Sequence, residues 1–232
     1  MKALKRAVLL LFVAISVCGV GGCGMKGNMT ATSGNREQEV ITEMEQYFQR
    51  RYPGVSYSVD GFIPSGWDGE EDILNLSTVI NGENERFYVS RCLEKDGTAT
   101  FGDTYLGLLL RDEVEQMASA VALDSFPNVR VFVFINQRFP EEIPPTATVA
   151  ELKSQGKFYN VDITVLVSEE EVDADNFREA AKAVVERWGE EGIPSYIRVI
   201  LVGGEIYGTA SRYTLSDVWV RDYLQEYHEI VK

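Results

Sequence analysis

The chain is poor in cysteine and histidine, and this scarcity excludes several kinds of site. Its 232 residues include three cysteines and one histidine. Cys18 and Cys23 lie close to the N-terminus, so Cys92 has no partner for a disulfide within the rest of the chain, and stability must come from packing. With His228 as the only histidine, a zinc site of the Cys/His type is excluded. Cys92 lies in the strand-like run 86–93, which is typical of a small buried hydrophobe.

Positive charge is also scarce. The chain has 22 lysines and arginines against 36 aspartates and glutamates, which gives a formal net charge of -14. Such an excess repels polyanions, so we expect no nucleic-acid partner. It favours solubility, cationic partners or divalent metal ions instead.

Long apolar runs are missing as well. The uncharged run 7–17 falls short of the roughly 20 residues that a membrane-spanning helix needs. It follows the basic residues Lys2, Lys5 and Arg6 and precedes small residues. A basic segment, a short apolar segment and then small residues are the three parts of an export signal.

The segment Gly19-Val20-Gly21-Gly22-Cys23 resembles the lipobox of bacterial lipoproteins, in which an aliphatic residue stands three positions before a cysteine. Val20 departs from the commoner leucine. The resemblance implies that residues 1–22 are a signal peptide and that Cys23 carries acyl chains, palmitate among them. The expected partner is then the lipid bilayer, with the protein anchored at the extracytoplasmic face of a cell membrane. A secretory signal without lipidation and a retained apolar helix stay open as alternatives.

Residues 23–35 combine this cysteine with a flexible tether rich in glycine, serine and threonine. A first unit, 36–126, follows. Its pattern predicts a helix that opens at Asn35, then strands 55–63, 72–80, 86–93 and 98–101, with tight turns at 81–82 and 96–97. Asp103 or Thr104 is expected to cap a second long helix that ends at 126–127. The first unit is therefore predicted as a helix, an antiparallel meander and a helix.

A second unit, 127–232, has a different pattern. Residues 129–135 are apolar on both faces and predict a central strand, while 159–167 and 196–202 alternate between apolar and polar residues. Helical spacing predicts helices over 148–156 and 175–188, and a last helix from Thr214 to about Val231. This β-α-β-α-β-α order and the meander together predict an α+β fold, with helices mainly on one face of a sheet.

No stretch carries the signature of a catalytic site or a cofactor. The chain has no glycine-flanked serine elbow, and the glycines of 202–208 have neither the dinucleotide spacing nor the Walker spacing. The acidic run 169–175 lacks the central glycine of a calcium loop, so we interpret it as the solvated start of a helix. We therefore expect no cofactor and no metal.

Two candidate contact regions remain. Trp67 lies in the loop 64–71 among glycines and acids, where its ring either stacks on a glycan or anchors a protein partner, or folds back as a plug. The second region depends on topology. If the strands ending at 135, 167 and 202 are parallel neighbours, their ends form one ligand edge. The partly polar sheet face favours antiparallel strands instead, which would scatter that edge. The residues of this possible ligand edge are Arg138, Glu169, Gly203, Gly204 and Glu205.

These patterns predict a membrane-anchored extracytoplasmic lipoprotein that acts as a non-catalytic binding or interaction module. The alternative is a cell-envelope hydrolase that uses paired carboxylates, because 36 acidic residues offer many pairs. The sequence leaves open whether the protein is an enzyme. Geometry separates the two, since a hydrolase needs converging carboxylates in a deep pocket.

Overall fold

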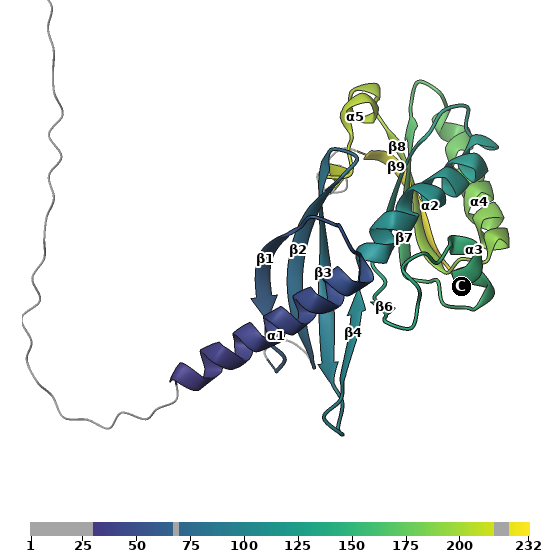
Figure 1. Ribbon diagram of the computed structural model, residues 1–232. Helices are drawn as coiled ribbons and strands as arrows, with labels where there is room; N and C mark the ends of the chain where they lie inside the picture. Colours follow the sequence, from purple (N-terminus) through teal and green to yellow (C-terminus); the bar gives the residue numbers. More distant parts are fainter. Residues whose placement is uncertain (1–29, 67–69, 216–222) are drawn as a thin grey trace, which may run out of the picture.

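The computed structural model describes residues 30–66, 70–215 and 223–232, with side chains from residue 35 onwards (Figure 1). Cys23, Trp67 and residues 216–222 lie outside this part of the chain. The described residues form an α+β fold, as predicted, with helices packed on two sheets. The sheets lie side by side (Figure 1). The first sheet has a helix on one face, whereas the second has its long helices on one face and a short helix on the other.

The first sheet is an antiparallel meander with the order β1-β2-β3-β4-β6. The turn between β2 and β3 is formed by Asn81 and Gly82, which have φ angles of 54° and 85°. Both angles are positive, as a two-residue hairpin turn with right-handed strand twist requires. The strands are β1 (Ser58–Ile63), β2 (Glu71–Ile80), β3 (Glu83–Leu93), β4 (Ala99–Asp103) and β6 (Phe139–Pro140).

Helix α1 (Thr30–Arg51) covers one face of this sheet (Figure 1). It begins before the predicted Asn35. Met44, Tyr47 and Phe48 are fully buried in a core that includes Phe87 and Val89 of β3. Because side chains alternate along a strand, Arg86 and Tyr88 point to the opposite face. On that face Arg86 is exposed and Tyr88 is half-buried.

The second sheet has the order β5-β7-β8-β9. Strands β7 and β8 are parallel and are connected by the crossover helix α4. The two outer pairs, β5 with β7 and β8 with β9, are antiparallel. Its helices are α2 (Tyr105–Leu123), α3 (Val149–Ser154), α4 (Ala174–Glu191) and the short α5 (Gly204–Thr209). Its strands are β5 (Arg130–Ile135), β7 (Val161–Ser168), β8 (Ser195–Val202) and β9 (Tyr223–Val231).

Strand β5 lies at the edge of this sheet, so the prediction of a central strand for 129–135 was wrong. Its apolar character on both faces has another cause, because one face packs in the core with α2 and the other packs, through Phe132, in a separate buried cluster with Leu166. The Val133 N–H donates to Glu115 Oε1 of α2 at 3.0 Å. Gly107 approaches Ile135 so closely that a Cβ would lie 3.0 Å from its carbonyl oxygen. Helix α2 therefore replaces a neighbouring strand.

The predicted last helix is also wrong, because residues 223–231 form strand β9 beside β8. Tyr227 and Val231 pack against the second core, as the helical pattern required. A spacing of four residues, however, fits a period of 3.6 and a period of 2 equally well. Pairing with β8 satisfies backbone groups that would otherwise be left at a sheet edge, and this long-range gain decides between the two periods.

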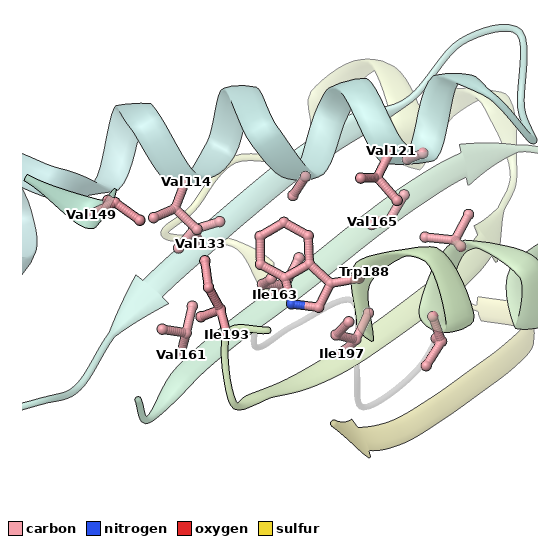
Figure 2. Close-up of a cluster of buried hydrophobic side chains, with 14 of the residues drawn as sticks. Val114, Val121, Val133, Val149, Val161, Ile163, Val165, Trp188, Ile193 and Ile197 are labelled. Carbon is pink, nitrogen blue, oxygen red and sulfur yellow. The ribbon is translucent and has the colours of Figure 1, made fainter. Parts of the chain in front are cut away.

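The second core lies between this sheet and helices α2, α3 and α4. Figure 2 shows the Trp188 indole in its centre, beside Val133, Ile163 and Ile197. Trp188 is 1% exposed, and its indole N–H donates to Ser195 Oγ at 3.1 Å. A buried tryptophan of this kind requires a partner for its one polar atom.

The change of pattern at Pro127 falls between α2 and β5, but the two halves of the chain are interlocked. Helix α2, from the first half, contributes most of its apolar stripe to the second core. Strand β6, from the second half, pairs with β4 of the first sheet. The junction between the sheets is therefore formed by both halves.

Candidate functional site

A cleft of about 930 Å³ lies at this junction. Its floor is the start of α2, and its walls are strand β3 and the C-terminal end of β5. The volume is within the range of roughly 300–1,000 Å³ that ligand pockets commonly have. The lining residues that bear on its chemistry are Asn75, Glu83, Asn84, Glu85, Arg86, Tyr88, Leu108, Arg111, Phe134, Asn136, Arg212 and Tyr213.

The β3 wall is polar and aromatic because the open face of the first sheet continues into the cleft. Tyr88 of β3 lies opposite Asn75 of the neighbouring strand β2, and Arg86 lies two residues before Tyr88 on the same face. Burial raises the pKa of Tyr88, and the nearby Glu71 adds to this while Arg138 opposes it. Tyr88 therefore presents a neutral hydroxyl, which donates and accepts hydrogen bonds.

An ionic cluster closes one end of the cleft. Arg111 of α2 contacts Glu85 of β3 at 2.7 Å, and both side chains are almost fully buried. Arg212 contacts Glu115 at 2.5 Å and Glu83 at 3.3 Å. The cluster thus joins β3, α2 and the segment that follows α5. Burial by itself would lower the pKa of Arg111, but its hydrogen bond to Glu85 and that charge outweigh burial and raise the pKa.

This cluster decides what the converging carboxylates can do. Glu85 and Glu115 are each in contact with a guanidinium, at 2.7 and 2.5 Å. Such charge-assisted pairs occupy carboxylate oxygens. A glycosidase instead needs two carboxylates that reach the scissile bond. The arrangement holds β3, α2 and the segment after α5 together.

The segment between α5 and β9 reaches across to the first sheet. The Tyr213 hydroxyl donates to the Asn84 carbonyl oxygen at 3.1 Å, next to the contact between Arg212 and Glu83. These contacts hold the β2–β3 turn against the second half of the chain. Two buried atoms of the cluster have no hydrogen-bond partner within the described residues, namely Arg111 Nε and Arg212 Nε.

The predicted ligand edge is only partly assembled. Glu169 follows β7 and Gly203, Gly204 and Glu205 follow β8, and these two strands are parallel, so their ends meet. The Glu169 N–H donates to the Val202 carbonyl oxygen at 2.9 Å. However, Glu170 Oε1 would lie 2.7 Å from a Cβ at Gly204. Carboxylates crowd the glycines, which disfavours an anion there.

Arg138 does not belong to this edge, and its inclusion was wrong. Strand β5 is antiparallel to β7, so its C-terminal end lies at the start of β7. Arg138 packs against the open face of the first sheet instead, where its Nε–H donates to Ser90 Oγ and its guanidinium lies 3.6 Å from Glu71. Antiparallel pairing thus separates the predicted set, as the partly polar sheet face indicated.

Cys92 differs from expectation, whereas His228 lies at the surface as expected, although on a strand rather than a helix. Cys92 is half-buried rather than buried, because it lies on the open face of the first sheet between Glu71 and Thr100. His228 lies on β9, where its side chain is 58% exposed and Nδ1 is 3.6 Å from Glu226 Oε1. Neither residue has a base or nucleophile arranged beside it for catalysis among these contacts.

Within residues 30–66, 70–215 and 223–232, no three His, Cys, Asp or Glu side chains are grouped as a metal site would need. In the acidic run, the Asp173 carboxylate accepts from the Asp175 N–H at 3.2 Å and caps α4. No helix in this part of the chain is both long enough and apolar enough to cross a membrane.

No protein family, curated protein or solved structure matches this chain. The candidate site therefore rests on its own geometry. Sequence reasoning missed Arg86, Arg111 and Arg212. The alternation of β3 was a usable signal, since it already placed Arg86 and Tyr88 on the face opposite Phe87 and Val89. Nothing local in the sequence links Arg212 to residues 83–85.

Proposed function

We propose that the protein is a lipid-anchored, extracytoplasmic binding module without catalytic activity, and that its ligand occupies the cleft between β3, α2 and β5. The lipobox-like segment ending at Cys23 supports the anchor. The cleft supports binding, because it combines apolar surface with a few convergent polar groups, as ligand sites do. Trp67 stays a predicted partner contact on the same first unit.

The pairing of the cleft carboxylates with arginines carries the preference for binding over hydrolysis. Glu85 contacts Arg111 at 2.7 Å, and Glu115 contacts Arg212 at 2.5 Å. Both acids are committed to structural contacts, so neither is available to protonate a leaving group. What remains free at the cleft surface, such as Asn75, Tyr88 and Phe134, is suited to contact rather than to chemistry.

The anchor is tested with Cys23→Ala in the full chain. Loss of the acyl chains should move the protein from the detergent phase to the aqueous phase, because stable attachment takes two or more chains. Incorporation of labelled palmitate should be lost in parallel. A variant that keeps partitioning into detergent would contradict lipid anchoring through this residue.

The binding function is tested by blocking the cleft. Asn75→Trp places a large side chain in the cleft, and Arg50→Gln on the outside of α1 serves as the control. Panels of short peptides and of cell-wall oligosaccharides are titrated by calorimetry, and the mixtures are then analysed for cleavage. We expect a ligand that binds the control, fails to bind Asn75→Trp and is recovered intact. Cleavage that disappears in Glu115→Gln would overturn the proposal in favour of the hydrolase.

A further inference from the structure

Arg86 is the one charged residue of the cleft that has no partner among the described residues. The other charged residues there are Glu83, Glu85, Arg111 and Arg212, and they are engaged in ion pairs with one another or with Glu115. Arg86 is exposed and makes no ion pair or hydrogen bond with the described chain. The cleft therefore presents one uncompensated positive charge.

The surroundings of Arg86 keep that charge available. On its own face it lies opposite Ser77, with Asn84 and Tyr88 two positions away along β3. The Asp60 carboxylate is engaged by the residue opposite Arg86, because it accepts a hydrogen bond from Ser77 Oγ at 3.0 Å. Farther along the same face, Glu71 is turned to Arg138. In a chain with a net charge of -14, a free guanidinium in a concave surface is the feature that would select a ligand.

The rest of the cleft fits a peptide. Asn75 and Asn84 offer side-chain amides, each of which can donate to a peptide C=O and accept from a peptide N–H. The Asn136 amide also lines the cleft, with its Nδ2 already donating to Asp162 Oδ2 at 2.9 Å. Phe134 and Leu108 are half-buried and give an apolar surface for a side chain. A polyanion would be repelled by the acidic chain, but a single carboxylate can form a charge-assisted, two-pronged pair with a guanidinium.

We propose that the cleft binds the C-terminal end of a peptide, with the terminal carboxylate on Arg86 and the preceding residues against Tyr88, Asn75 and Phe134. This inference rests on the proposed binding function and specifies its ligand. It requires a free carboxylate at the end of the ligand, and it assigns specificity to an arginine that takes no part in holding the fold together.

The test uses two pools of N-acetylated random tetrapeptides, one with free C-terminal carboxylates and one with C-terminal amides. Each pool is passed over the immobilised full chain in detergent micelles, and retained peptides are identified and titrated. We expect affinities at least ten-fold higher for the acids than for the matching amides. Arg86→Gln should remove this preference, while the equally exposed Arg50→Gln keeps it.

The outcomes separate this inference from the proposed function. If Asn75→Trp abolishes binding but amides bind as well as acids, the cleft is a binding site and the carboxylate assignment is wrong. If Asn75→Trp and Arg86→Gln both leave peptide binding unchanged, the cleft itself is not the site. A third arm compares glucuronic acid with glucose, and a preference for the sugar acid over every peptide acid would replace the peptide with a glycan. Circular dichroism of both variants checks that they are folded.

Discussion

Helix α2 is held at two polar clusters that differ in how completely their groups are paired. At its start, the Asp103 carboxylate accepts from the Tyr47 and Tyr52 hydroxyls at 3.0 and 2.9 Å and lies 2.9 Å from Arg51. The N–H groups of Tyr105 and Leu106 complete its contacts. Two turns later, the cluster around Arg212 leaves two buried atoms, Arg111 Nε and Arg212 Nε, without a hydrogen-bond partner among the described residues.

The difference follows from what each cluster connects. Arg51 also donates to the carbonyl oxygens of Glu141 and Ile143, so the Asp103 cluster joins α1, β4, α2 and the loop after β6 in one closed network. The Arg212 cluster borders the cleft. A fully paired network fixes a single arrangement, whereas a partly paired one leaves buried polar groups unsatisfied beside the cleft, at a cost in stability.

The largest expected effect comes from Asp103→Ala. It leaves the Arg51 guanidinium buried without its carboxylate, and breaking such a buried pair typically costs about 3–5 kcal/mol. Urea denaturation measures the change. Asp112→Ala, at an exposed position of α2, is the control and should stay within about 0.5 kcal/mol of the parent. Equal effects of the two changes would show that the Asp103 network does not hold α2.

A smaller effect is expected at the open cluster. Arg212→Gln removes the cation shared by Glu83 and Glu115 and should lower the free energy of unfolding by about 1.5–3 kcal/mol. Arg187→Gln breaks the solvated pair with Asp124, in which both side chains are about half exposed, and should cost less than about 1 kcal/mol. If Arg212→Gln lowered the free energy of unfolding by less than Arg187→Gln does, the result would contradict the role given to the cluster.

The stability cost of Tyr52→Phe, which removes a hydroxyl from the Asp103 cluster, should depend on pH. Burial, with the charge of Asp103, raises the pKa of Tyr52 well above its ordinary value of 10.0. The hydroxyl therefore stabilises the fold at pH values below about 10, and this contribution is lost as pH rises further, because only the unfolded chain then ionises. We expect a cost of about 1.5 kcal/mol at pH 8 that shrinks towards pH 11. Tyr159→Phe, at a side chain 50% exposed, is the matched control.

The smallest effect concerns the helix between the two clusters. Gly107→Ala forces a Cβ against the Ile135 carbonyl at 3.0 Å, and this should cost about 1 kcal/mol net despite the better helix propensity of alanine. Gly189→Ala in α4 meets nothing nearer than Val231 Cγ1 at 3.9 Å and should stabilise by about 0.5–1 kcal/mol. Thermal unfolding measures the stability of both variants. If the two substitutions changed stability in the same direction, this prediction would be refuted.

Much of the fold could be predicted because its signals are local. The Asn81-Gly82 turn, the cap from Asp103 and the capping box of Thr148 with Glu151 each lie within a few residues of the element that they start or end. Strands β2 to β4 follow from such turns, since a short turn permits only an antiparallel neighbour. These elements were found where the pattern put them.

The rest depended on long-range pairing. The edge position of β5 could not be inferred, because α2 imitates a neighbouring strand through Glu115 and Gly107. The strand at 223–231 shares its apolar spacing with a helix, and only β8 decides between them. The same dependence on long-range pairing explains why the candidate site could not be predicted from the sequence. Arg138 was placed by an assumed parallel pairing, and the cleft needs residues from both sheets.

The bridge from Arg212 and Tyr213 to Glu83 and Asn84 has a consequence for the order in which the molecule is completed. Each contact joins residues 129 positions apart. The meander can form from neighbouring hairpins while the chain is still being synthesised, but loop closure over this distance must wait until residue 213 has been made. A nascent chain therefore carries a finished first sheet well before the contacts of Arg212 and Tyr213 close the cleft between the two sheets.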